Sequence, residues 1–160
     1  MSELPVIFTD LDGTLLDHDT YSAEEARLVL EKVTAKGIPV IPATSKTYSE
    51  VVEFRDSMNL THAFIVENGA ALYVPMDTDI RCPMGSKLFE GYWVREFGVK
   101  RQALCDVLEA LDMNGTYQFK SLTDMRTSEV ADVTGLDLAS AQRAQPVSYT
   151  HLRAHETHPN

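Results

Sequence analysis

Three short runs of apolar residues in the first half of the chain each end in a polar loop. They are residues 6–8, 40–41 and 64–66, and each has the continuous apolar character of a strand buried on both faces. Between them, residues 22–36 and 47–58 carry apolar side chains three or four positions apart, which predicts amphipathic helices. Strands that alternate with such helices predict an α/β fold in which parallel strands are joined by right-handed crossovers.

Both predicted helices begin with a capping signal. Ser22 and Glu25 have the spacing of a capping box. Thr47 and Glu50 repeat this spacing at the start of the second helix. We expect the apolar stripes that follow to face the sheet. These stripes are Ala26, Val29, Leu30 and Val33 in the first helix, and Val51, Phe54 and Met58 in the second.

The pattern changes after the third apolar run. Residues 72–74 predict a strand that returns beside this run, and a further short strand is expected at residues 117–119. We predict that residues 1–75 form the N-terminal part of the sheet core. Residues 76–145 are expected to form part of an α+β second domain. Residues 146–160 have no hydrophobic period, and we expect them to form an unstructured, non-native tail.

The amino-acid composition says more about the partners of the chain than about its fold. A formal net charge of −10 makes binding to nucleic acid or anionic lipid unexpected, so an anionic substrate would need a metal ion or local basic residues. The two cysteines, Cys82 and Cys105, have no metal-binding spacing. With no leader and no long apolar stretch, we expect a cytoplasmic protein without a membrane span. The sequence gives no indication of the oligomeric state.

The strongest candidate for chemistry is Asp10-Leu11-Asp12-Gly13-Thr14, directly after the first apolar run. A carboxylate such as Asp10 at a strand end can attack phosphorus and form an aspartyl-phosphate, which divides a difficult displacement into two easier ones. Asp12 can protonate the leaving oxygen and then take a proton from water. Gly13 would allow a tight turn close to the phosphate. The segment is also a common turn sequence, but its place after a buried strand favours an active site.

Polar residues also follow the second and third runs. Thr44, Ser45 and Lys46 follow the second run, and Asn68 follows the third. Because the carboxyl ends of parallel strands meet at one edge of a sheet, we expect these residues to contact phosphate or substrate, together with Gly13. Lys46 could attract an anionic group and Asn68 could orient the first loop. An exposed lysine near a helix start and an ordinary turn asparagine would explain these two residues equally well.

The first loop matches the first motif of the haloacid dehalogenase superfamily of phosphohydrolases, which the chain resembles from about residue 4 to residue 145. This resemblance implies a Rossmann-like parallel-sheet core, incomplete here, with an inserted α+β cap. It implies that Asp10 is the nucleophile, that Asp12 is the general acid/base, and that both bind Mg²⁺, Asp12 through its carbonyl. Thr44 matches the second motif, a hydroxyl that holds the transferring phosphoryl group, with Ser45 as the alternative.

Four segments look most like the mannosyl-3-phosphoglycerate phosphatase family: residues 8–17, 44–47, 66–70 and 124–138. This likeness implies hydrolysis of mannosyl-3-phosphoglycerate, a small phosphorylated sugar-glycerate, to mannosylglycerate and phosphate. Another capped sugar-phosphate phosphatase of the superfamily is the alternative. A phospho-accepting receiver module is disfavoured, because its phosphorylated aspartate would follow the third strand, where this chain has Glu67-Asn68.

The chain departs from the superfamily in its second half. The superfamily's third-motif lysine and fourth-motif acidic cluster lie after the cap, and no segment after residue 75 matches them. We therefore expect the chain itself to be a catalytically inactive fragment of a longer phosphatase. The tail from Pro146 resembles adapter-derived read-through of the kind fused to truncated sequences. His151 and His155 in this tail have a helical zinc spacing but lack a third ligand.

Overall fold

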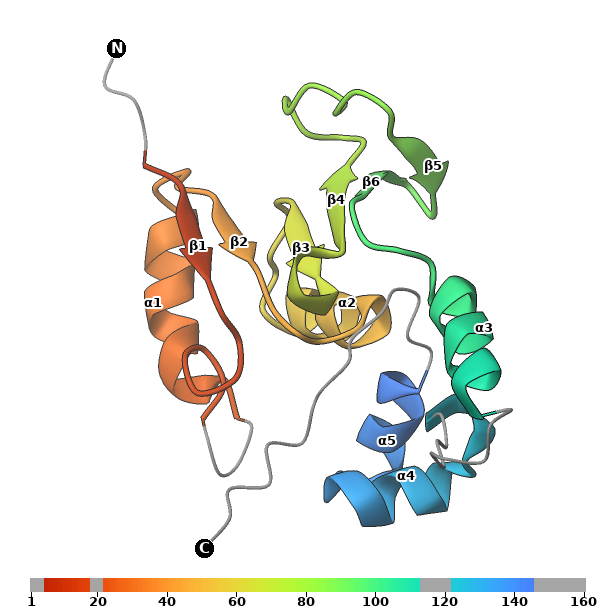
Figure 1. Cartoon of the computed structure of the whole chain (residues 1–160). Coiled ribbons are helices and arrows are strands. Elements are labelled where there is room, and N and C mark those ends of the chain that lie inside the picture. The colour runs from red at the N-terminus through yellow and green to blue at the C-terminus, as the bar shows by residue number, and fades with distance from the viewer. Residues whose placement is uncertain (1–4, 18–21, 113–121, 146–160) are drawn as a thin grey trace, which may run out of the picture.

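The computed structural model describes residues 5–17, 22–112 and 122–145, and Figure 1 shows how their elements are arranged. The strand predicted at residues 117–119 and the tail predicted from Pro146 lie outside these ranges. In chain order the elements are β1 (Ile7–Thr9), α1 (Glu24–Thr34), β2 (Val40–Pro42), α2 (Tyr48–Ser57), β3 (Phe64–Val66), the 3-10 turn η1 (Glu67–Gly69), β4 (Ala71–Pro75), β5 (Lys87–Phe89), β6 (Tyr92–Glu96), α3 (Arg101–Asp112), the 3-10 turn η2 (Leu122–Asp124), α4 (Thr127–Thr134) and α5 (Leu138–Ala144).

The first three strands run parallel, which confirms the predicted α/β class. β1 pairs with β2, with Ile7 opposite Val40, and a parallel bridge between Ala43 and Ile65 joins the end of β2 to β3. The sheet then continues in antiparallel order through β4, β6 and β5. Because β6 pairs along the whole of β4, the sheet extends beyond residue 75. The division of the chain into core and cap at that residue stays a prediction.

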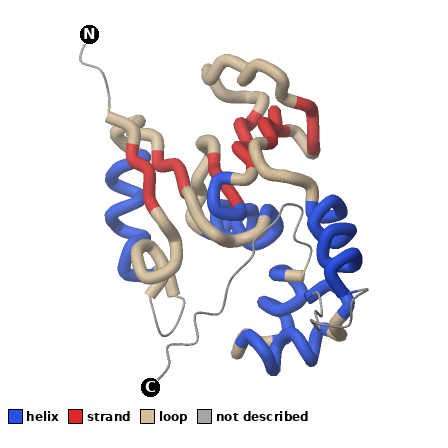
Figure 2. Tube along the Cα trace, viewed as in Figure 1, coloured by secondary structure: helices blue, strands red, loops and turns tan. Residues whose placement is uncertain are grey.

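In the view of Figure 1 and Figure 2, helix α1 lies beside β1 on the left, α2 lies near the middle, and α3, α4 and α5 lie on the right. Helix α5 packs against both α4 and α2, so the last described helix contacts the first half of the chain. None of the helices in the described part of the chain combines the length and apolar character needed to cross a bilayer.

Helix α2 follows the sequence prediction closely. The Thr47 backbone N–H donates to Glu50 Oε2 at 2.8 Å and the Glu50 N–H donates to Thr47 Oγ1 at 3.5 Å, so the predicted capping box forms. Val51, Phe54 and Met58 are all buried, as their spacing predicts. This face of α2 packs into the main core beside β3.

Arg55 lies inside this core, although its residue type is rarely buried. Only 3% of its surface is exposed, and its guanidinium lies 4.5 Å from the centre of the Phe64 ring. It donates to the Tyr92 hydroxyl at 3.0 Å and to the His62 carbonyl at 2.7 Å. These bonds connect α2 to β6 and to the loop before β3. Burial, with a smaller contribution from the Arg55 charge, lowers the pKa of His62.

The prediction that the first strand is buried on both faces is wrong. Val6, Ile7 and Phe8 are 49%, 37% and 64% exposed. Within the described residues β2 is the one strand that pairs with β1, so the opposite edge of β1 and much of its apolar surface face outward. The strand forms where it was expected, but it lacks the neighbours that would bury it.

The prediction of a capping box at the start of α1 is also wrong. Ala23 occupies the capping position and offers no side-chain hydrogen bond. The Ser22 hydroxyl instead accepts a hydrogen bond from the Glu24 N–H at 3.3 Å, a long contact. Of the predicted α1 stripe, Leu30 is buried, whereas Val29 is 61% exposed.

Candidate active site

The loop after β1 is wound around one backbone carbonyl. The Leu11 carbonyl accepts hydrogen bonds from the N–H groups of residues 14–16 at 2.8–3.2 Å. Gly13 makes this turn with a φ of +67°, a conformation that costs glycine little. The Leu11 side chain is fully buried, so it anchors the loop in the core. Asp10 and Asp12 lie on either side of this anchor and are therefore held at the end of the strand.

The loop after β2 is fixed to the end of β3 by three backbone hydrogen bonds. The Thr44 N–H donates to the Ile65 carbonyl at 3.1 Å. In the other direction, the N–H groups of Glu67 and Asn68 donate to the carbonyls of Lys46 and Thr44, each at 3.0 Å. Because each loop supplies both donors and acceptors, the hydrogen bonds join the two loops into one side of the site.

The loops enclose a cleft of about 640 Å³. The lining residues are Asp10, Asp12, Ala43, Thr44, Ser45, Ile65, Asn68 and Gly69. The three predicted strand ends therefore meet at one site, and five of the predicted site residues face the same space. Gly13 and Lys46 are not among the lining residues. The individual roles of all these side chains remain predictions.

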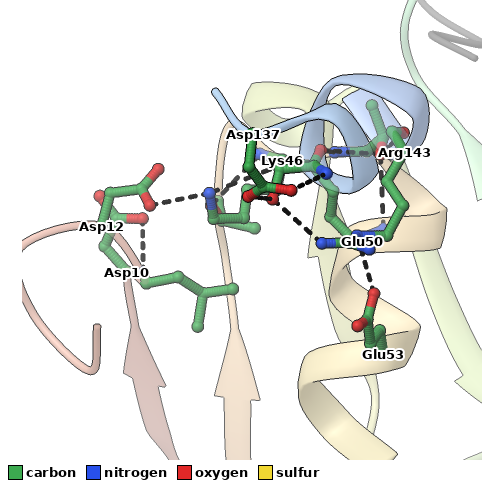
Figure 3. A network of polar contacts seen from close by, with 11 residues as sticks. Asp10, Asp12, Lys46, Glu50, Glu53, Asp137 and Arg143 are labelled. Carbon is green, nitrogen blue, oxygen red and sulfur yellow. Dashed lines mark hydrogen bonds and ion pairs between the residues drawn. The ribbon is translucent and has the colours of Figure 1, made fainter. Parts of the chain in front are cut away.

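The ammonium group of Lys46 contacts Asp12 (Figure 3). Its Nζ lies 2.9 Å from Asp12 Oδ1 and 3.9 Å from Glu50 Oε1, and 17% of the Lys46 side chain is exposed. Asp12 Oδ1 is buried and accepts no well-aligned hydrogen bond from the described residues, so the contact is chiefly one of charge. The contact between Lys46 and Asp12 was not predicted from the sequence. The contact between Lys46 and Glu50 could have been predicted from their i,i+4 spacing.

Asn68, which lines the cleft, and the buried residue before it, Glu67, both have left-handed backbone. Glu67 has a φ of +50° and Asn68 a φ of +55°. Asparagine tolerates this conformation better than most residues, but glutamate does not. Glu67 is also 99% buried, and no pattern in the sequence indicated this. Strained backbone of this kind is often found at functional sites, which is consistent with Asn68 facing the cleft.

The carboxylates of Asp10 and Asp12 are hard oxygen donors of the type that Mg²⁺ prefers. The described ranges, residues 5–17, 22–112 and 122–145, contain no group of three or more Asp, Glu, His or Cys side chains that could hold a metal ion. These residues therefore fit one side of a magnesium site. The remaining ligands would be water, substrate or groups from elsewhere in the protein.

Residues 7–82 match the family model of haloacid dehalogenase-like hydrolases. This segment of the chain is therefore similar to haloacid dehalogenase-like hydrolases. The matched segment includes all three loops of the cleft. Among solved structures, a phosphatase of the same superfamily from Bacteroides thetaiotaomicron aligns with a TM-score of 0.54 and 19% identity, covering 90% of this chain and 49% of that one. At this identity the alignment supports the fold alone.

Two relatives share more sequence with this chain. It is 38% identical over 144 residues to the glucosyl-3-phosphoglycerate/mannosyl-3-phosphoglycerate phosphatase of Methanococcoides burtonii, covering 90% of this chain and 53% of that protein. The protein of the same name from Persephonella marina is 35% identical over 148 residues, with coverages of 91% and 53%. The chain thus spans about half the length of the curated relatives it matches.

Proposed function

We propose that this chain is the N-terminal half of a phosphatase that hydrolyses mannosyl-3-phosphoglycerate to mannosylglycerate and phosphate. The observation that best supports this proposal is that Asp10, Asp12 and Thr44 line one cleft. They do so within the segment that matches haloacid dehalogenase-like hydrolases. The names of the relatives support the substrate and extend it to the glucosyl compound. Both cysteines are free thiols, in keeping with a reducing cytoplasm.

Asp10 is the proposed nucleophile. Its Oδ1 accepts a hydrogen bond from the Leu11 N–H at 2.7 Å, which fixes the carboxylate and leaves Oδ2 to attack phosphorus. As the bond from Oδ2 to phosphorus forms, the bond from phosphorus to the glycerate oxygen breaks, and Asp12 gives that oxygen a proton. Water then attacks phosphorus and gives a proton to Asp12, and the bond to Asp10 breaks. Phosphate and free Asp10 result.

Thr44 and the neighbouring polar residues would hold the phosphoryl group. Thr44 is 4% exposed, and its Oγ1 accepts a hydrogen bond from the Lys46 N–H at 3.3 Å, so the hydroxyl can donate its own proton to a phosphoryl oxygen. Ser45 is the alternative donor, and Asn68 of η1, which lines the same cleft, would contact the substrate. Gly13 would allow the phosphate to approach the backbone of the first loop.

Mg²⁺ is the proposed cofactor. When bound by the Asp10 carboxylate and the Asp12 carbonyl, it would offset the negative charge that collects on the phosphoryl oxygens during transfer. None of the described residues that line the cleft is a lysine or an arginine, and Lys46 already contacts Asp12. With so few metal ligands in the described residues, we propose that the chain alone is inactive.

Substitution of the two aspartates tests the chemistry in a protein extended to the length of the relatives. Asp10→Asn should abolish turnover and phosphoenzyme formation, with a loss of roughly 10⁴–10⁶-fold. Asp12→Asn should still form phosphoenzyme from an ester with a good leaving group but release phosphate slowly. Asp56→Asn, an exposed acid on α2, is the matched control and should keep wild-type rates. Near-normal turnover by Asp10→Asn would show that the nucleophile lies elsewhere.

A substrate panel separates the two candidate activities. The extended protein should prefer mannosyl- and glucosyl-3-phosphoglycerate over other sugar phosphates, and EDTA should remove the activity. A clear preference for another sugar phosphate would favour a different capped phosphatase of the superfamily. The 160-residue chain, assayed beside it, should show no magnesium-dependent turnover. Comparable turnover by the short chain would contradict the fragment interpretation.

A further inference from the structure

Lys46 is held between two carboxylates. On one side its ammonium lies 2.9 Å from Asp12 Oδ1, and on the other it lies 3.9 Å from Glu50 Oε1. All three side chains are partly buried, with exposures of 17% for Lys46, 35% for Asp12 and 15% for Glu50. Lysine has a long side chain that loses much rotamer freedom when it is held in one place, so a fixed partner is needed to keep it there.

Glu50 is such a fixed partner. Its Oε2 accepts a hydrogen bond from the Thr47 backbone N–H at 2.8 Å, and the Thr47 hydroxyl lies at the same distance from it. These contacts belong to the capping box that starts α2. The remaining oxygen, Oε1, faces Lys46. The position of the lysine is therefore tied to the first turn of a helix whose opposite face is buried in the core.

Helix α5 also contacts the first turns of α2. The Thr47 hydroxyl lies 3.0 Å from the Arg143 carbonyl, and Arg143 Nε lies 2.8 Å from Glu53 Oε2 on α2 (Figure 3). A hydroxyl has one proton, so its contacts with Glu50 and with Arg143 are alternatives. The start of α2 is thus held by its own cap and by a second helix, which makes it a rigid base for Lys46.

We propose that Lys46 is a positioning residue for Asp12 and is not a phosphate ligand. This inference rests on the proposed function. Asp12 must give a proton in the first step and accept one in the second, so its carboxylate must stay in one orientation through both steps. The Lys46 ammonium holds Oδ1 at a buried position outside the reacting centre and leaves Oδ2 to exchange the proton. Asp12 itself remains the residue that touches the reacting oxygens.

Kinetics of the extended protein distinguish positioning from phosphate binding. Lys46→Met should lower kcat by about 10–100-fold, the range expected when a catalytic group is displaced by about 1 Å, while KM changes less than about twofold. Phosphoenzyme should accumulate with a good leaving group, because the second proton transfer slows. Lys46→Arg should recover part of the rate, Glu50→Gln should lose less than Lys46→Met, and the exposed Lys36→Met should match wild type.

Two results would overturn the proposal. One is a KM increase of about tenfold or more in Lys46→Met without phosphoenzyme accumulation, which is the signature of a lost phosphate ligand. The other is a fall in kcat that merely follows a lower melting temperature, which is the signature of a structural residue. A wild-type protein that forms no phosphoenzyme at all would instead contradict the proposed function.

If the wild-type protein forms no phosphoenzyme, the position of Asp12 can still be measured in the metal-free 160-residue chain. Three-bond couplings measured by NMR report the χ1 rotamer of Asp12. We expect a single rotamer in the wild-type chain and in Lys46→Arg, and averaged couplings in Lys46→Met. Averaged couplings in the wild-type chain, or a single unchanged rotamer in Lys46→Met, would show that Lys46 does not position Asp12.

Discussion

Strands β1 and β3 are alike in sequence but differ in their surroundings. Each is a short apolar run that ends in a polar loop of the cleft, and each was expected to be buried. In the structure, Phe64 and Val66 of β3 are fully buried, whereas Phe8 of β1 is 64% exposed. β3 has β4 beside it and the core face of α2 against it, while the outer edge of β1 has no partner among the described residues.

The difference shows that an apolar run predicts a strand, but its neighbours decide whether the strand is buried. It also shows that β1, the strand that leads into the proposed nucleophile, is the most exposed strand of the parallel group. An exposed edge with apolar side chains favours association with other chains. The first loop keeps its shape because Leu11, not β1, anchors it in the core.

The largest expected effect on stability comes from truncating Phe64 of β3. Phe64→Ala should lower the free energy of unfolding of the 160-residue chain by roughly 3–5 kcal/mol, since the ring is fully buried and Arg55 stacks on it. Phe8→Ala, its matched control, should cost less than about 0.5 kcal/mol. Urea denaturation measures both values. Equal costs for the two variants would mean that β1 is packed as well as β3.

A protein extended to the length of the relatives provides a second test of the difference in burial between β1 and β3. If the longer protein places a further segment against β1, Phe8→Ala should there cost roughly 1.5–3 kcal/mol, the value for a large side chain that becomes buried. The longer protein should also bind less of a hydrophobic dye than the 160-residue chain and remain monomeric at higher concentration. A Phe8→Ala cost that stays near zero at full length would mean that β1 remains uncovered.

The N-termini of α1 and α2 differ in their capping, and we expect this difference to have a smaller effect on stability. Thr47→Ala should lower the free energy of unfolding by about 1–2 kcal/mol, because Thr47 is buried and caps α2. Ser22→Ala should cost less than about 0.5 kcal/mol, because the expected box at α1 does not form. Thermal denaturation of both variants checks this order. A larger loss for Ser22→Ala would show that α1 is capped after all.

The smallest expected effect is a pH dependence that comes from His62. Burial holds the pKa of His62 below its ordinary value of 6.5, so the unfolded chain binds the proton more tightly than the folded one. The stability contributed by neutral His62 is therefore complete above pH 6.5 and is lost as the pH falls below it. His62→Gln should have a flatter melting temperature between pH 7.5 and 5.5 than wild type. Parallel profiles would exclude this role.

Local patterns were enough to predict β1 to β4, the cap of α2 and the meeting of the three loops, because each depends on neighbouring residues or on parallel topology. Strands β5 and β6 were not predicted. Contacts between distant segments could not be predicted. The burial of Arg55 depends on a gap between Phe64 and Tyr92 that no periodicity describes. The pairing of Lys46 with Asp12 depends on the distance between two loops, which the sequence does not fix.

The left-handed backbone at Asn68 limits how the cleft could change during evolution. Glycine, asparagine and aspartate are the residues that accept this conformation readily, and a β-branched side chain would cost about 1–2 kcal/mol. Glycine would remove the side chain from the cleft. Aspartate would add a third carboxylate to a space already lined by Asp10 and Asp12, which would repel an anionic ligand. Asparagine keeps a small neutral polar group there at little conformational cost, so most substitutions at this position would cost stability or change the charge of the cleft.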